Sequence, residues 1–176
     1  MTRHSDLLVL GTGNAGMAAA GVAQRAGKSV TLVESGDVGG TCAIRGCVPK
    51  KVLVAAAANL DAIARASDHA ISVGEVKLDW PALIKRERTF VEGVPDMFRS
   101  SITSRGMTLV TGKAVFTGPN AVSVEGESYT ADKIIIATGS KPARLPIEGW
   151  ELTATSDDLL TLETLPSEVV FVGGGV

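Results

Sequence analysis

Two cysteines, Cys42 and Cys47, are the only ones in the sequence, and four residues separate them. They lie just before an apolar run, residues 52–58, that predicts a helix. Two thiols on successive turns at a helix N-terminus can close a small disulfide ring. The unpaired N–H groups of that terminus and the positive charges of Lys50 and Lys51 lower the pKa of a nearby thiol, which activates its sulfur as a nucleophile. The spacing therefore predicts a redox-active dithiol.

Two other roles for this cysteine pair are weaker. A structural disulfide across so short a ring removes little conformational freedom from the unfolded chain. A zinc site needs more Cys or His ligands than this neighbourhood contains, so we expect no metal site. The redox interpretation also agrees with a nucleotide-binding motif that lies upstream of the cysteines.

That upstream motif is a glycine-rich loop, residues 11–16, preceded by an apolar run that predicts a strand at residues 7–10. Gly11 permits the tight turn, Gly13 lets the backbone approach a pyrophosphate, and Gly16 lets the following helix pack against the strand. A glycine loop of this kind is weak evidence by itself, so its structural context decides its meaning.

The residues after the glycine loop supply the rest of a βαβ nucleotide-binding motif. Helix-forming residues continue to Ala26, and Gly27 fits the C-cap of that helix. A second predicted strand, residues 29–33, ends at Glu34, about twenty positions on, where an acidic residue binds ribose hydroxyls. We therefore predict an α/β fold with a Rossmann-like nucleotide-binding unit and a parallel sheet.

The middle of the sequence predicts helices and then a small antiparallel set of strands. After a loop at residues 66–79, helical spacing of apolar residues begins at Asp79, a predicted N-cap, and reaches Gly106, with an interruption at Pro95. Short strands follow at residues 108–111, 114–117 and 121–124, and a buried one at 133–137. The last of these ends in Ala137-Thr138-Gly139, a turn in which the glycine allows a ligand to approach the backbone.

The final residues predict the start of a second nucleotide site. A strand at residues 169–172 leads into Gly173, Gly174 and Gly175, which is the first half of a dinucleotide-binding turn. We therefore expect the sequence to be a fragment of a longer protein.

The composition is that of a soluble intracellular protein. It is 45% hydrophobic and 20% charged with a net charge of −2, so it has no basic excess for nucleic acid. It contains neither an evident signal peptide nor an apolar run of membrane-spanning length. We expect a cytoplasmic protein with no membrane or nucleic-acid partner. A cysteine pair in a reducing compartment serves catalysis more often than structure.

Together these motifs resemble the flavoprotein disulfide reductases, the family that includes glutathione reductase, dihydrolipoamide dehydrogenase and mercuric reductase. The resemblance extends over the whole sequence, and the block from Gly39 to Lys51 is its most specific part. It implies FAD at the first glycine loop, NADPH or NADH at the second, a small-molecule substrate, and a homodimer formed through a missing C-terminal domain. Residues 1–150 would form the first segment of the FAD-binding domain. Residues 151–176 would form a connector and the incomplete start of an NAD(P)H-binding domain.

The resemblance also implies roles for single residues. Cys47 would be the flavin-proximal sulfur that forms a charge-transfer thiolate, and Cys42 the sulfur that exchanges with substrate. Lys50 or Lys51 would lie near flavin N5, and Glu34 would bind the adenosine ribose. The remaining implied FAD contacts are Gly11, Gly13, Asn14, Ala15, Gly16, Ser35, Gly36, Gly40, Thr41, Gly112, Ala114, Ala137, Thr138 and Gly139, and the implied NAD(P) contacts are Gly173 and Gly175.

The implied function is electron transfer from NAD(P)H through FAD to the Cys42–Cys47 disulfide, and from there to a disulfide, a metal ion or another small acceptor. The fragment itself would not turn over. A flavin-binding redox sensor without turnover is the alternative. Gly21 stands where many glutathione reductases carry a carboxylate-binding arginine, and Phe98 where some carry a tyrosine. We therefore expect glutathione disulfide to be a poor substrate.

Overall fold

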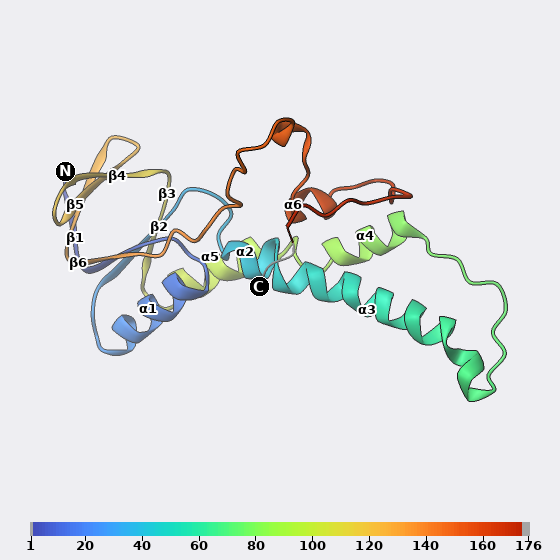
Figure 1. The fold of residues 1–176 in the computed structure, drawn as a ribbon. Coiled ribbons are helices and arrows are strands. Elements are labelled where there is room, and N and C mark those ends of the chain that lie inside the picture. The colour runs from blue at the N-terminus through green and yellow to red at the C-terminus, as the bar shows by residue number, and fades with distance from the viewer. Residues whose placement is uncertain (1, 174–176) are drawn as a thin grey trace.

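The computed structural model describes residues 2–173 (Figure 1). Its strands are β1 (Arg3–Leu10), β2 (Val30–Glu34), β3 (Thr108–Thr111), β4 (Ala114–Gly118), β5 (Ala121–Val124) and β6 (Glu127–Ile136). Its helices are α1 (Asn14–Arg25), α2 (Gly40–Ile44), α3 (Cys47–Ala64), α4 (Trp80–Arg88), α5 (Val94–Ser104) and α6 (Ser156–Leu159), with 3-10 turns η1 at Ala66–His69 and η2 at Trp150–Leu152.

All six strands form one sheet in the order β3-β2-β1-β6-β5-β4. The first four strands of that order are parallel, whereas β5 is antiparallel to β6 and β4 is antiparallel to β5. β1 lies inside the sheet, with Leu8 opposite Thr31 of β2 and Ile134 of β6. This arrangement confirms the predicted α/β class, with a parallel sheet extended by antiparallel strands.

Successive side chains of the central strands pack on opposite faces of the sheet. On one face Val9 and Leu32 pack with Ala20 of α1 and Ile102 of α5. On the other face Leu8 is fully buried in a separate cluster with residues of the antiparallel strands. Burial of each such aliphatic side chain stabilises the fold by about 1.5–3 kcal/mol. The core thus holds β1 and β2 rigidly, and their carboxyl ends carry the predicted nucleotide loop.

Two strands differ from the prediction. Residues 108–111 were expected in the antiparallel set, but β3 instead pairs in parallel with β2, which places Leu109 opposite Leu32. β6 starts at Glu127 rather than at residue 133, since its first half also pairs with β5. Its end is not buried as expected, because Ile136 is 66% exposed.

The strand predicted at residues 169–172 is absent from the structure. Val170 and Phe171 are 88% and 86% exposed there. A strand needs a hydrogen-bonded neighbour, and among residues 2–173 nothing pairs with this segment. Its apolar, β-branched composition is therefore not enough to make it a strand.

Three helix boundaries lie at or next to the predicted residues. The side chain of Asp79 caps α4 by accepting a hydrogen bond from the Ala82 N–H at 3.0 Å. Pro95 lies in the first turn of α5, so the expected interruption separates α4 from α5. Gly27 follows the end of α1 with a φ of +75°, as the predicted C-cap requires.

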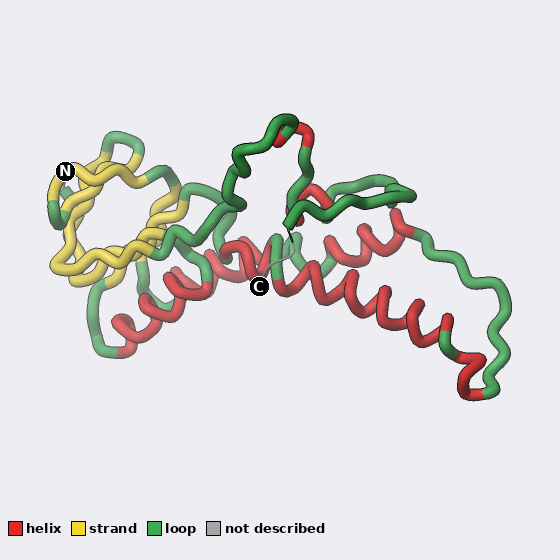
Figure 2. Tube along the Cα trace, in the orientation of Figure 1, coloured by secondary structure: helices red, strands yellow, loops and turns green. Residues whose placement is uncertain are grey.

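Helices α3 and α4 extend away from the sheet and are joined by a long loop (Figure 2). The segment after β6 returns over these helices. There the Trp80 indole N–H donates to the Leu162 carbonyl at 2.9 Å, and Arg45 forms an ion pair with Asp157 at 3.6 Å. Within the described part of the chain, none of the helices combines the length and apolarity needed to cross a membrane.

Candidate functional site

The segments after the parallel strands meet at one edge of the sheet. The Ala137 N–H donates to the Leu10 carbonyl at 2.8 Å, which ties the end of β6 to the end of β1. The Gly112 N–H donates to the Glu34 carbonyl at 2.8 Å, which ties the residue after β3 to the end of β2. Ligands of open α/β sheets bind at this carboxyl edge. The structure therefore brings the predicted segments together where a nucleotide would bind.

The three motif glycines differ in whether the fold itself has room for a side chain at their positions. A Cβ at Gly11 would lie 2.2 Å from the Ala137 carbonyl oxygen, and one at Gly16 would lie 2.0 Å from the Gly11 carbonyl oxygen. These two glycines are required by packing of backbone against backbone. A Cβ at Gly13 would meet only the Gly40 Cα, at an ordinary 3.7 Å. Gly13 is therefore free to face a ligand.

The N-terminus of α1 fits a pyrophosphate. Gly13 is its N-cap residue, and neither a capping side chain nor an acidic residue occupies its first turn. The first N–H groups of a helix lack intrahelical acceptors, and the helix dipole places partial positive charge there. These donors at Asn14, Ala15 and Gly16 match the anionic centre of a dinucleotide.

Glu34 is held in place by its own loop. Its Oε2 accepts hydrogen bonds from the Thr12 N–H at 2.9 Å and the Thr12 hydroxyl at 2.7 Å, and its Oε1 accepts one from the Gly36 N–H at 2.9 Å. Partial burial raises the pKa of Glu34, but these hydrogen bonds, with one from the Ser35 N–H, outweigh it and lower the pKa below its usual value. Glu34 is therefore ionised at neutral pH. An ionised carboxylate is the kind of acceptor that a ribose hydroxyl needs, and that role stays a prediction.

We expect Glu34→Ala to weaken FAD binding about ten- to a hundredfold, because a hydrogen bond to a carboxylate contributes about 1.5–3 kcal/mol. The variant should also unfold at a lower temperature, since it leaves the Thr12 donors without their acceptor. Isothermal titration of FAD and a thermal melt measure the two effects. Glu75→Ala, in an exposed loop, is the control. An unchanged FAD affinity would exclude the ribose role.

The two cysteines are adjacent free thiols. Cys42 lies in α2 and is partly buried, and Cys47 is the exposed first residue of α3. The pKa of Cys42 is lowered by hydrogen bonds from the Cys47 thiol and the Asn14 side chain, helped by the Cys47 N–H and the charge of Lys51. The pKa of Cys47 is raised, first because its thiol donates to Cys42. The expected activation therefore applies to Cys42, but its largest causes are side-chain hydrogen bonds, and the helix N–H group and the lysine contribute less.

This direction differs from the roles that the family resemblance implies. The residues of this chain favour the thiolate on Cys42, whereas the resemblance places the charge-transfer thiolate on Cys47. A lowered pKa suits Cys42 as the nucleophile that exchanges with substrate. Lys50 lowers the pKa of Cys47 as Lys51 lowers that of Cys42, so which lysine lies nearer flavin N5 stays a prediction.

The glycine loop, residues 11–16, touches the segment that carries both cysteines, residues 39–47, which we call the dithiol loop. Gly40, the first residue of α2, has a φ of +73°, and a Cβ there would lie 2.4 Å from the Gly13 Cα. Cys42 follows two residues later, and the side chain of Asn14, the first residue of α1, helps to lower the pKa of its thiol. Two motifs that are separate in the sequence therefore form a single site.

The other predicted residues lie at or near the same edge, and their roles remain predictions. Ala114 begins β4. The exposed members are Ala15, Ser35, Gly36, Thr41, Lys50, Lys51, Thr138 and Gly139. Gly36 bonds to Glu34, although the resemblance placed it against the cofactor near the disulfide. Gly173 has a φ of +104° with no atom within 4 Å of its Cβ position, and Gly175 lies outside the described residues.

Sequence reasoning missed two features. Thr12 gave no signal beyond its place between two glycines, yet it is fully buried in the loop. The guanidinium groups of Arg25 and Arg105 lie 3.4 and 3.8 Å from the position of a Cβ on Gly21. Positive charge is therefore present beside residue 21 even though no arginine stands there. Arg25 is one helical turn further along α1, so its spacing was a signal, whereas Arg105 is brought there only by the tertiary structure.

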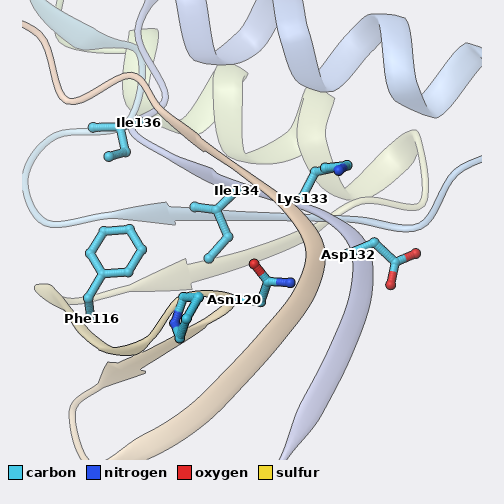
Figure 3. Close-up of a pocket in the computed structure, with 7 residues that line it drawn as sticks. Phe116, Asn120, Asp132, Lys133, Ile134 and Ile136 are labelled. Carbon is cyan, nitrogen blue, oxygen red and sulfur yellow. The ribbon is translucent and has the colours of Figure 1, made fainter.

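A groove on the antiparallel side of the sheet contains none of the predicted site residues. Figure 3 shows Phe116 and Asn120 on one side of it and Ile134 and Ile136 of β6 on the other. The charged residues Asp132 and Lys133 also line it. It holds no cysteine, so we assign the functional site to the edge where the two loops touch.

The fold and the site together define an α/β nucleotide-binding protein with a dithiol beside its glycine loop. Comparison with known proteins agrees. The chain is 34% identical over 175 residues to a glutathione reductase of Nostoc sp. (strain PCC 7120 / SAG 25.82 / UTEX 2576). This match covers 99% of this chain and 38% of the relative. It is 35% identical over 180 residues to a dihydrolipoyl dehydrogenase of Chlamydia pneumoniae, covering 100% of this chain and 39% of the relative.

The model of the pyridine nucleotide-disulphide oxidoreductase family matches residues 5–176, and the chain belongs to that family. Proteins of this kind use FAD and NAD(P)H. The chain spans less than two fifths of the length of these relatives. A glutathione reductase of Burkholderia cepacia matches equally well, at 35% identity over 170 residues, so the names of the relatives do not separate the two activities.

Proposed function

We propose that this chain is the flavin- and dithiol-bearing part of a longer FAD-dependent oxidoreductase. Electrons from NAD(P)H would pass through FAD to the Cys42–Cys47 disulfide and on to a small acceptor. The contact between Gly13 of the glycine loop and Gly40 of the dithiol loop is the observation that carries this proposal. A bound dinucleotide at α1 would lie beside the sulfurs.

When bound, FAD would supply the redox chemistry that carries two electrons from NAD(P)H to the disulfide. This chain's own residues hold the pyrophosphate at α1, hold the ribose at Glu34, and place the sulfurs. Two electrons and two protons, one of them from solvent, break the S–S bond and give two thiols. The Cys42 thiolate then attacks an acceptor disulfide, and Cys47 resolves the mixed disulfide. The cysteine pair returns to its oxidised form, and the acceptor leaves as two thiols.

The direct test counts thiols. The longer protein that contains this chain is incubated anaerobically with NADPH or NADH, and its free thiols are labelled and located by mass spectrometry. We expect two new thiols, at Cys42 and Cys47, only when the nicotinamide is present. Thiols that respond to glutathione but not to NADPH or NADH would instead support the redox sensor without turnover.

The acceptor is proposed to be a small molecule other than glutathione disulfide. Phe98 packs against the core beside Gly39 and offers no hydroxyl to a polar substrate. Position 21 has no arginine of its own, and the charge beside it comes from Arg25 and Arg105. The homodimer, the cytoplasmic location and the boundary at residue 150 belong to the same proposal.

We expect glutathione disulfide to have a kcat/KM at least about tenfold below that of the best small acceptor, because an unpaired polar group on the substrate costs about 1–3 kcal/mol. The panel contains small disulfides, quinones, oxygen and Hg(II). Arg25→Gln and Arg105→Gln show whether the neighbouring guanidinium groups serve any disulfide substrate. A clear preference for glutathione disulfide would overturn this choice of acceptor, whether or not these variants abolish it.

A further inference from the structure

Thr12 joins the glycine loop to the dithiol loop by hydrogen bonds. Its side chain is fully buried, and its hydroxyl donates to Glu34 Oε2 at 2.7 Å while it accepts from the Gly39 N–H at 3.0 Å. The hydroxyl therefore uses both its donor and an acceptor position. These two hydrogen bonds form a series that begins at the Glu34 carboxylate, which is proposed to bind the ribose.

The same series of hydrogen bonds ends at Gly39, at the start of α2. Gly39 is the N-cap residue of this helix, with a φ of +123°, and no side chain caps the helix. The helix has only five residues, so it gains little stability of its own. Cys42 is its third residue. The bond from Gly39 to Thr12, together with the packing of Gly40 against Gly13, therefore restrains where Cys42 lies.

We propose that Thr12 is a positioning residue that holds the dithiol loop against the ribose-binding carboxylate and so sets the geometry of the Cys42–Cys47 pair. This inference rests on the proposed function for its meaning in the reaction. Its test uses the chain without added cofactor, so its outcome does not depend on whether FAD binds.

Removal of the Thr12 hydroxyl would break the hydrogen-bonded link between Glu34 and Gly39. Thr12→Val keeps the shape of the side chain but leaves the buried Gly39 N–H without an acceptor. The loop then relaxes toward water or toward another acceptor, and α2 moves with it. The contacts of Cys42 with the Cys47 thiol and the Asn14 side chain lengthen, and these contacts keep the pKa of Cys42 low. The pKa of Cys42 therefore rises toward its ordinary value.

The experiment measures alkylation of Cys42 by iodoacetamide against pH in the reduced chain, with the two sulfurs distinguished by peptide mass. In Thr12→Val we expect the midpoint to move to higher pH and the rate at pH 7 to fall about three- to tenfold, because only the thiolate reacts. Thr12→Ser keeps the hydroxyl and should react as the wild type does. Thr31→Val removes a hydroxyl from a buried threonine of β2 and serves as the matched control.

Three results would overturn the inference. The first is an unchanged Cys42 profile in folded Thr12→Val, and the second is an equal change in Thr12→Ser. The third is rapid hydrogen exchange of the Gly39 amide in the wild type, since the proposed bond must protect it. Thr12→Ala is the second variant if Thr12→Val does not fold. The amide measurement needs no variant and can overturn the inference by itself.

Discussion

Replacing either Cys42 or Cys47 by serine is expected to lower the proposed NAD(P)H-dependent disulfide reduction of the proposed longer enzyme by at least roughly a thousandfold in kcat. Serine is nearly the same size, so the loop persists while the chemistry is lost. One sulfur must attack the acceptor and the other must resolve the mixed disulfide, and neither does both. A steady-state assay with a small disulfide gives the result.

Two controls show that the loss is specific. Ala43→Ser adds a hydroxyl inside the same loop and should keep its activity. Each cysteine variant should still pass electrons from NAD(P)H to a quinone, which needs the flavin but not the sulfurs. The family resemblance further predicts that Cys47→Ser loses the long-wavelength charge-transfer band and Cys42→Ser keeps it. Disulfide reduction by either variant within about tenfold of the wild-type rate would refute the dithiol mechanism.

Replacing Gly16 by alanine is expected to destabilise the fold severely, whereas the same change at Gly13 is not. The Gly16 methyl group would lie 2.0 Å from the Gly11 carbonyl oxygen and 2.9 Å from its carbon, and a backbone group does not swing aside as a side chain does. We expect a cost of about 3 kcal/mol or more, the upper part of the usual range for overpacking. That corresponds to a melting temperature lower by about 6–12 °C.

Gly13→Ala separates ligand binding from folding. Its methyl group meets only the Gly40 Cα at 3.7 Å, and Gly13 has a φ of −71°, which any residue adopts. Its stability should stay within about 1 kcal/mol of the wild type. Its FAD affinity should fall, because the methyl group occupies the space where the pyrophosphate approaches α1. Normal FAD binding by Gly13→Ala, or normal stability of Gly16→Ala, would show that the loop is used differently.

The features predicted correctly from the sequence are those set by local chemistry. The turn at Gly11, the cap at Asp79 and the break at Pro95 each depend on a few neighbouring residues, so composition and spacing were enough to find them. The dithiol and the glycine loop were likewise visible as short motifs. The sequence alone did not show that the two motifs touch, because that contact depends on how the chain returns after β2.

The features predicted wrongly depend on partners distant in the sequence. Residues 108–111 form a strand as expected, but which strand they join is decided by the fit of Leu109 and Val110 beside β2. Residues 169–172 have strand composition and no strand partner within the described chain. Thr12 was missed for the same reason, since only the tertiary structure brings its hydroxyl to Glu34 and Gly39.

The pairing of β1 with β6 also determines when the sheet can be completed during synthesis. β1 finds β2 early, since Asp6 and Ser29 are only 23 residues apart, whereas His4 and Thr130 are 126 residues apart. At a synthesis rate of about 5–20 residues per second, β6 follows β1 from the ribosome after roughly 6–25 s. Throughout that time one edge of β1 has no partner and is open to pairing with other chains. Nascent-chain folding should therefore remain incomplete until residues 127–136 have emerged.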